Sequence, residues 1–519
     1  MAETNTSNIG FEKQIWDAAC VLRGNIDASE YKSVVLGLIF LKYISDRFEA
    51  KYQELVAEGD GFEEDKDEYT AENIFFVPEN ARWSVISAAA HTPEIGTVID
   101  EAMRSIEKEN KRLKDILPKN FARPELDKRR LGEVVDLFTN IQMIDHGNSK
   151  DILGRTYEYC LAKFAEQEGK LAGEFYTPSC VVRTLVEVLQ PYNGRVYDPC
   201  CGSGGMFVQS TDLIREKRGD IRRINVYGQE KEAATYRLAK MNLALRGISH
   251  NLGEESDSTF THDLFKGLYF DYIMANPPFN LKGWYDENLK NDSRWVDYQT
   301  PPESNANYAW ILHILSHLKA LKGVAGFLLA NGALGDSDTL EIRKKLIQND
   351  KVEAIIILPR ELFITTDISV TLWILNQNKK GGAYHGRMLR SRAGEILFMD
   401  LRTWTENPVK NESKKKVLLS SEQIQKAADI YHTWQSEGTD GANYAVPELY
   451  RSVSKDEIEK QGWSLVPSKY IEFIDHDLEI DYAAEMSRIQ KEMREVLKQE
   501  MKSQKMLEDA FRGIGYELA

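Results

Sequence analysis

An acidic residue and several glycines lie together in VYDPCCGSGGMF, residues 196–207, where a β-prone run gives way to a helix. Gly202, Gly204 and Gly205 let the backbone turn tightly and approach a ligand, and the helix that follows offers free N–H groups. The stretch is neither the GxGxxG fingerprint nor a phosphate loop, because no Gly-Lys-Ser/Thr follows. Alone, the turn could be plain loop geometry. If it binds a ligand, Asp198 would repel a phosphate and suits a ligand with a cationic amino group.

A second acid, Glu230, ends the next β-prone run, INVYGQE. In nucleoside-binding α/β folds a carboxylate at this place accepts both hydroxyl groups of a ribose. Standing alone, Glu230 would be an exposed helix-capping acid, but the upstream Asp198 and glycines favour the ribose. Asp263 in THDLF is a candidate for binding an adenine amino group, and Asp257 in SDSTF competes with it for that role.

A third β-prone run, DYIMANPPFN at 271–280, stops at an amide, two prolines and an aromatic ring. Proline lacks an N–H group and has a fixed φ, so Asn276-Pro277-Pro278-Phe279 cannot continue a strand. The simplest interpretation is a strand-ending turn. A chemical role for these residues depends on what else lies at the same edge of the sheet.

The elements that would position these residues alternate between strand-like and helix-like runs. The strand-like runs are GRVYDPC, INVYGQE, DYIMANPP, GVAGFLLANG, VEAIIILP and VTLWILN. This alternation predicts an open, mostly parallel α/β sheet, which binds ligands at the carboxyl ends of its strands. Beyond the last clear strand we expect mostly helix and no module for reading DNA sequence.

Helical patterns flank this α/β region. Residues 1–150 show apolar spacing of three and four and predict an all-helical domain. Residues 476–519 predict a charged helical arm whose apolar stripe would face a partner. That stripe consists of Met486, Ile489, Met493, Val496, Leu507 and Ala510, interrupted by Glu500 and Ser503.

Composition narrows the class of protein. A length of 519 residues predicts two or three domains, and the sequence shows neither a membrane-length apolar run nor a signal peptide, so we expect a cytoplasmic chain. The five cysteines form no CxxC pair and no zinc-ligand spacing, so no metal is expected. A net charge of −15 disfavours stand-alone DNA binding. The basic stretch 108–130 would serve DNA or simply be a solvated helix face.

The ordered motifs carry a family resemblance. GEFYTP at 173–178, then DPCCGSGG, YGQE and ANPPFN, resemble an S-adenosylmethionine-dependent amino-methyltransferase. With the helical N-terminal domain and C-terminal arm, nearly the full chain resembles the modification (methyltransferase) subunit of type I restriction–modification systems. The resemblance implies a Rossmann-like catalytic domain at 151–475, a helical domain at 1–150 for DNA or partner contacts, and an arm at 476–519 for a specificity subunit.

The resemblance also implies a cofactor site for S-adenosylmethionine, with Glu230 on its ribose and no metal. Cys200-Cys201 departs from the small apolar residues often found in this turn, which the glycines should leave intact. The implied cofactor-binding residues are Glu174, Phe175, Tyr176, Thr177, Pro178, Ser179, Asp198, Gly202, Ser203, Gly204, Gly205, Glu230 and Asp263.

Asn276, Pro277, Pro278 and Phe279 become the implied catalytic residues. An exocyclic amino group on a purine is a poor nucleophile because its lone pair is delocalised. The side-chain carbonyl of Asn276 and the backbone carbonyl of Pro277 can both accept bonds from it, which would localise that lone pair for attack on the sulfonium methyl group. Phe279 offers a face for a flipped base. The resemblance points to adenine N6 more than to cytosine N4.

Three other interpretations remain open at this point. Protein methyltransferases that modify a glutamine amide also use Asn-Pro-Pro with an aromatic residue, although a GEFYTP segment and such helical regions are unusual among them. A scaffold with an inactive methyltransferase fold is a second alternative. A chain that recognises its DNA sequence unaided is a third. We expect instead a separate specificity subunit, a restriction subunit in the larger complex, and two copies of this chain per specificity subunit on double-stranded DNA.

Overall fold

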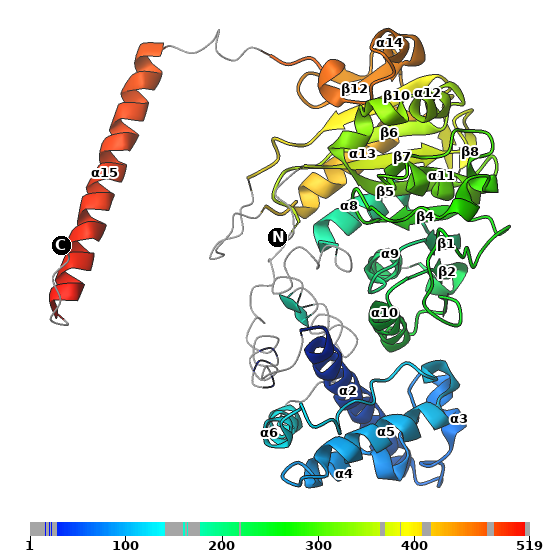
Figure 1. Cartoon of the computed structure of the whole chain (residues 1–519), viewed down its shortest axis with the longest axis vertical. Helices are drawn as coiled ribbons and strands as arrows, with labels where there is room; N and C mark the ends of the chain where they lie inside the picture. Colours follow the sequence, from blue (N-terminus) through cyan, green and yellow to red (C-terminus); the bar gives the residue numbers. More distant parts are fainter. Residues whose placement is uncertain are drawn as a thin grey trace. The chain divides into compact units, whose positions relative to one another are not determined.

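The computed structural model describes residues 16, 20, 22, 28–140, 159–160, 163–164, 177–216, 219–363, 369–384, 386–406, 417–474 and 482–513. The chain forms two units, residues 1–471 and 472–519 (Figure 1). Among the described helices, none combines the length and the apolar character that a membrane span requires.

The N-terminal part of the first unit is helical, as its apolar spacing predicts, and within 28–140 the structure assigns no strand. Its central helix α2 is apolar on several sides, which is typical of a helix surrounded by others. The remaining helices pack around it. The helices are α2 (Ala28–Glu58), α3 (Lys66–Ala71), α4 (Trp83–Ala88), α5 (Ile95–Glu109) and α6 (Lys128–Thr139), with 3-10 turns η1 (Glu79–Ala81) and η2 (Lys111–Leu113).

The rest of the first unit is built on one ten-stranded sheet, in the order β11-β12-β10-β6-β7-β5-β4-β1-β2-β3. The strands are β1 (Gly194–Asp198), β2 (Ile224–Gly228), β3 (His250–Asn251), β4 (Tyr272–Ala275), β5 (Val324–Ala330), β6 (Val352–Ile357), β7 (Val370–Asn376), β10 (Glu395–Asp400), β11 (Ala445–Val446) and β12 (Tyr450–Ser454). All six predicted strands are present, as β1, β2, β4, β5, β6 and β7.

The sheet is mixed. Strands β3, β2, β1, β4 and β5 run parallel, but β7 is antiparallel to both β5 and β6, and β12 is antiparallel to β10. Strands β10 and β12 also extend the sheet beyond the last predicted strand. Helix predominates there as expected, in α13 (Ser421–Gln435), α14 (Lys455–Lys460) and α15 (Tyr482–Gly513), but the strands β10 and β12 were not predicted.

Two apolar cores cover the two faces of this sheet. One contains α8 (Ser179–Leu189), α9 (Gly205–Glu216), α10 (Ala233–Leu245) and α13 (Ser421–Gln435). The other contains α11 (Asn307–His317), α12 (Leu340–Gln348) and α14 (Lys455–Lys460). Successive residues of β4 and β5 alternate between the two cores, so these strands are buried on both faces and read as continuous apolar runs.

The strand order reverses between β1 and β4. From β1 the chain proceeds through β2 to β3 on one side, whereas β4 and β5 lie on the other. Open α/β sheets bind their ligands at such a switch point, outside the carboxyl ends of the strands. The three predicted motifs follow β1, β2 and β4, so the topology brings them to this one edge.

The second unit contains the predicted helix, α15 (Tyr482–Gly513). Its apolar stripe is exposed: Met486, Ile489, Met493, Val496 and Leu507 all lie open, together with Leu497, Met501 and Met506.

Part of the basic stretch 108–130 serves the helical region itself. The carboxylate of Glu107 accepts from the backbone N–H of Leu117 at 2.7 Å and pairs with Lys119. Lys128 donates to two backbone carbonyls of the loop before α6. Lys111 and other cations of this stretch are exposed, which both a DNA contact and a solvated face require.

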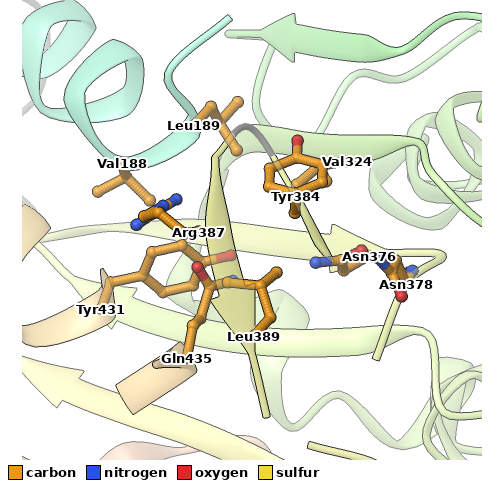
Figure 2. A pocket seen from close by; sticks show the side chains of 10 residues that line it. All are labelled: Val188, Leu189, Val324, Asn376, Asn378, Tyr384, Arg387, Leu389, Tyr431 and Gln435. Atoms are coloured by element: carbon orange, nitrogen blue, oxygen red, sulfur yellow. Dashed lines mark hydrogen bonds between the residues drawn. The ribbon is translucent and has the colours of Figure 1, made fainter. Parts of the chain in front are cut away.

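The hairpin β8 (Gly382–Tyr384) and β9 (Arg387–Leu389) lies by α8 and α13. Side chains from these elements surround a polar cavity of about 10 Å³, including Arg387, Tyr431 and Gln435 (Figure 2). A space of this size holds about one water molecule. It cannot hold a nucleoside, so the ligand site must lie elsewhere.

Candidate active site at the carboxyl ends of β1, β2 and β4

The glycine turn after β1 is joined to the end of β2 by backbone hydrogen bonds. The carbonyl of Asp198 accepts from the N–H of Gln229 at 3.0 Å, and the N–H of Cys201 donates to the carbonyl of Gln229 at 2.9 Å. Gly202 and Gly204 have φ values of +54° and +81°, in the left-handed region that favours glycine. The two glycines therefore allow the chain to reverse before α9 begins at Gly205.

Asp198 is buried, with 2% of its surface exposed, and its Oδ1 accepts from the backbone N–H of Cys200 at 3.0 Å. Burial raises the pKa of Asp198 to about 7, and the negative charge of Glu230 adds to this effect, while the bonds from Cys200 oppose it. Burial removes the water that would stabilise the negative charge of this carboxyl group. A cationic ligand can replace that stabilisation, so the position of Asp198 suits a ligand with a positive charge.

Glu230 bridges the two loops with its side chain. Its Oε2 accepts from the N–H of Gly202 at 3.0 Å and its Oε1 from the N–H of Glu232 at 2.8 Å. Burial raises the pKa of Glu230, and these backbone bonds oppose the rise. A carboxylate has about four acceptor positions, so one on each oxygen is left for a ligand such as a diol.

A cavity of about 600 Å³ opens beside Glu230. Its walls come from the residues that follow β1, β2, β3 and β4, including Cys200, Thr259 and Pro278. The volume lies in the range of small-molecule sites, which are about 300–1,000 Å³. Aromatic rings form much of the wall: the ring centroids of Phe260 and Trp310 lie 4.2 Å apart.

The chain after β4 places the amide of Asn276 beside the end of the GEFYTP segment. Asn276 Nδ2 donates to Thr177 Oγ1 at 2.9 Å, which fixes the amide and turns its other end away. Asn276 Oδ1 is buried and has no hydrogen-bond partner among the described residues. A buried acceptor without a donor is rare and costs free energy, so this oxygen is suited to a donor that a ligand supplies.

An amide network, which the sequence did not reveal, holds the residue after Phe279. Asn280 has φ +54°, and its N–H donates to Asn307 Oδ1 at 3.0 Å. In return Asn307 Nδ2 donates to Asn280 Oδ1 at 2.9 Å, and Asn305 Nδ2 donates to the same oxygen at 3.0 Å. The NPPF turn is thereby fixed at one end to Thr177 and at the other to the start of α11.

The ring of Phe279 is partly buried, and its centroid lies 6.1 Å from that of Phe363 in an edge-to-face arrangement. Phe363 is the last described residue before 364–368. The two rings form an apolar surface that begins three residues after Asn276 in the chain, and such a surface suits the stacking of a planar base.

The candidates for the adenine amino group are engaged elsewhere. Asp257 is paired with His262, a bond that lowers the pKa of Asp257, and Asp263 Oδ2 lies 2.9 Å from His317 Nε2. Neither carboxylate lines the cavity, whereas the intervening Ser258–Thr261 do.

Asp263, His313 and His317 hold ligand-type atoms within 4.8 Å of one another. His313 lies 3.1 Å from both the Tyr197 hydroxyl and the Arg294 guanidinium, and His317 bonds a backbone carbonyl as well as Asp263. Each ring nitrogen thus has a partner, and the guanidinium adds a positive charge that opposes a cation. The cluster is a buried hydrogen-bond network.

The remaining predicted residues have varied positions. Glu174, Phe175 and Tyr176 lie outside the described residues. Pro178 is buried, Ser179 is exposed at the start of α8, and the carbonyl of Ser203 accepts from Asn242 Nδ2 at 2.8 Å. Burial raises the pKa of the Cys200 thiol well above its usual value, so the thiol remains protonated.

Comparison with known proteins places this geometry in a family. A model described as "N-6 DNA Methylase" matches residues 148–477, and one described as "HsdM N-terminal domain" matches residues 11–138. The chain belongs to the N-6 DNA methylase family. The resemblance to modification subunits of type I restriction–modification systems is confirmed, and the protein is an adenine-specific DNA methyltransferase of that kind.

The sequence matches to individual relatives cover most of this chain and most of each relative. The chain is 34% identical to the methylase subunit of the type I restriction enzyme MjaIX from Methanocaldococcus jannaschii, over 98% of this chain and 92% of that protein. It is 35% identical to the HindI methylase subunit from Haemophilus influenzae, over 85% of this chain and 100% of that protein. The crystal structure of a type I methyltransferase subunit from Streptococcus thermophilus shares the fold, with a TM-score of 0.73, 23% identity, and coverage of 89% and 99% of the two chains.

Proposed function

We propose that this methylase transfers the methyl group of S-adenosylmethionine to N6 of an adenine flipped out of double-stranded DNA. The observation that carries the proposal is the buried Oδ1 of Asn276, which has no partner among the described residues while Nδ2 of the same amide is held by Thr177. An amino group of the target base is the donor that would satisfy this oxygen.

The cavity and its surroundings fit the cofactor. Glu230 has acceptor positions left for the ribose hydroxyls, and Asp198 provides a buried carboxyl group that a cationic amino group would ionise. Trp310, which lines the cavity, has a buried indole N–H without a partner among the described residues. When bound, S-adenosylmethionine supplies an activated methyl group on a sulfonium.

The chain's own residues prepare the amino group. Asn276 Oδ1 and the backbone carbonyl of Pro277 would each accept a hydrogen bond from one N–H of the adenine amino group. These bonds would draw the nitrogen towards tetrahedral geometry and localise its lone pair. Two prolines and the clamp between Asn280 and Asn307 hold these carbonyls still. Phe279 would stack on the flipped base. No covalent intermediate on the protein is required.

The proposal includes a complex. Its larger form would add a specificity subunit that reads the DNA sequence and a restriction subunit, with two copies of this chain per specificity subunit. The exposed apolar stripe of α15 supports contact of that helix with the specificity subunit, and the net charge of −15 supports a division of DNA binding between chains. The names of the relatives are consistent with this assembly.

Nucleoside analysis of DNA tests the proposal. The chain would be incubated with S-adenosylmethionine and DNA, alone and together with the specificity protein encoded beside it. N6-methyladenine should form only with the partner. Modification by the chain alone would refute the dependence on a partner, and N4-methylcytosine would refute the choice of base. Absence of a modified base in both samples, with the cofactor bound, would favour a protein substrate or a scaffold.

A further inference from the structure

The helical region contributes one residue to the wall of the cofactor cavity. Lys32, in the second turn of α2, lines the same cavity as Glu230 and is 5% exposed. The other lysines of the wall, Lys231 and Lys282, are exposed to solvent. Among the described residues, Lys32 is therefore the buried cation of this cavity, although it belongs to a different region from the cofactor loops.

Helix α10 links the cavity to the helical region that contains Lys32. Ala234, in the first turn of α10, lines the cavity, whereas Leu238 and Met241 belong to the core that α2 also forms. These three residues are spaced i, i+4 and i+7, so they share one face of the helix. One face of α10 thus passes from the cofactor cavity directly into the contact with the helical region.

We propose that Lys32 is a residue of the cofactor site and that its ammonium group donates a hydrogen bond to the nucleoside end of S-adenosylmethionine. This inference rests on the proposed function, because it takes the cavity beside Glu230 as the place of the ribose. Purine nitrogens and ribose oxygens are acceptors, and an ammonium group is a pure donor. Lys32 also interacts within the protein, but three N–H groups allow a bond to a ligand in addition.

The charge of the cofactor explains why Lys32 belongs at the nucleoside end. The sulfonium and the amino group are cationic and would be repelled by an ammonium group. Asp198, the last residue of β1, does not line this cavity, whereas Lys32 lines it together with Glu230 and with Ala234 of α10. The two charges therefore suit opposite ends of one ligand.

A site shared by two regions couples them. If the cofactor bonds both Glu230 and Lys32, its binding stabilises the contact between α2 and α10, and a disturbed contact weakens binding by the same factor. The helical region would then sense whether the catalytic domain is loaded with cofactor.

Two methionine variants of the full-length chain test the role of Lys32. Lys32→Met removes the cation and keeps the length of the side chain. Lys42→Met is the matched control, because Lys42 lies in the same helix, is also 5% exposed, and pairs with Asp46 instead of lining the cavity. Calorimetric titration would measure binding of S-adenosylhomocysteine and, separately, of adenosine.

We expect Lys32→Met to weaken both ligands by about tenfold or more, as for loss of a charge-assisted hydrogen bond, and Lys42→Met to leave both unchanged. Unchanged binding by Lys32→Met would overturn the inference. A loss confined to S-adenosylhomocysteine would also overturn it, since Lys32 would then contact the amino-acid end. If the wild-type chain bound neither ligand, the proposed cofactor site itself would fail.

Hydrogen exchange on the wild-type chain provides a test that does not depend on a variant's folding. Saturating S-adenosylhomocysteine should slow exchange in the cofactor loops and also in the turns of α2 around Lys32 and of α10 around Ala234. Protection of the loops after β1 and β2 without any protection of α2 would contradict the coupling.

Discussion

Two side chains of the site, the carboxylate of Glu230 and the amide of Asn276, differ in how far the protein itself satisfies their hydrogen-bonding atoms. Glu230 accepts from two backbone N–H groups, one on each oxygen, and so builds the loops that surround it. Asn276 is tied by its Nδ2 to Thr177, while its Oδ1 has no partner among the described residues. One side chain joins the loops of the site, and the other keeps a buried acceptor that no described residue satisfies.

This difference has a physical consequence for mutation. A residue that satisfies backbone groups affects folding and ligand binding together, because its loss leaves buried N–H groups without acceptors. A residue with an unsatisfied oxygen contributes little to folding, so its loss should affect the reaction alone.

Asn276→Ala should lower the single-turnover rate of methyl transfer by about 10²- to 10³-fold, the range found when one acceptor or donor to a transition state is removed. Cofactor affinity should stay within about twofold, and the free energy of unfolding within about 1 kcal/mol, because only the bond to Thr177 is lost. Quench-flow kinetics, calorimetric titration and urea unfolding measure the three quantities. Full activity would show that the side chain of Asn276 does not activate the amino group.

Glu230→Gln should weaken cofactor binding by about 10²-fold, since the charged acceptor for the ribose hydroxyls is lost. It should also lower the free energy of unfolding by about 1–3 kcal/mol, because an amide can accept from Gly202 or Glu232 but offers its NH2 to the other N–H. Titration and urea unfolding of the cofactor-free chain measure both. A loss of affinity without a loss of stability would refute the structural half of this account.

Asn307→Asp should lower the single-turnover rate by about tenfold, as expected when a positioning residue is disturbed and the amide acceptor moves slightly. An aspartate at position 307 can still accept from the backbone N–H of Asn280. It cannot donate to Oδ1 of Asn280, as Asn307 Nδ2 does. Cofactor affinity should not change. Asn349→Asp, on an exposed helix end away from this turn, is a suitable control. Equal rates for the two variants would show that the clamp does not position Asn276.

The pKa of Asp198, raised to about 7, predicts a several-fold effect of pH. Affinity for S-adenosylmethionine should increase as the pH rises through 7 and the carboxyl group ionises. Stability should change in the opposite direction: the folded-state pKa exceeds the unfolded value of about 3.9, so the stabilising proton is lost as the pH rises between them. Asp198→Asn should remove the part of the pH dependence that Asp198 contributes, both to cofactor affinity and to the free energy of unfolding. Titration and unfolding at several pH values measure the two.

The sequence predicted the site where the signal was local. Each of β1, β2 and β4 reads as a short apolar run that stops at Asp198, at Gly228 before Glu230, or at Asn276, and proline marks two of these ends. Parallel pairing then brings the ends together, so the ordered motifs were enough to place these residues at one edge of the sheet.

Contacts between distant residues were beyond the sequence. The bond from Asn276 to Thr177 and the clamp between Asn280 and Asn307 join segments that only the fold brings together. Their one local signal is an asparagine after NPPF, a residue type that tolerates the left-handed φ found at Asn280. Lys32 gave no signal, because a lysine in an apolar helix reads as a surface residue.

The assignment of Asp263 shows the opposite limit. Its position after a strand-like run suggested a ligand contact, but burial beside His317 gives the carboxylate a partner within the protein. Sequence order cannot tell whether a strand-end acid faces the cavity or the core, since that depends on the path of the loop.

A thermodynamic cycle can test whether Asn276 Oδ1 accepts a hydrogen bond from the amino group of the target adenine. It crosses Asn276→Ala with replacement of the target adenine by purine, which lacks the amino group, and measures duplex affinity of the complete methylase with its specificity subunit and S-adenosylhomocysteine. If Asn276 Oδ1 accepts from the amino group, the two changes should be non-additive, with a coupling of roughly 1 kcal/mol. Additive effects would show that this oxygen does not contact the target base.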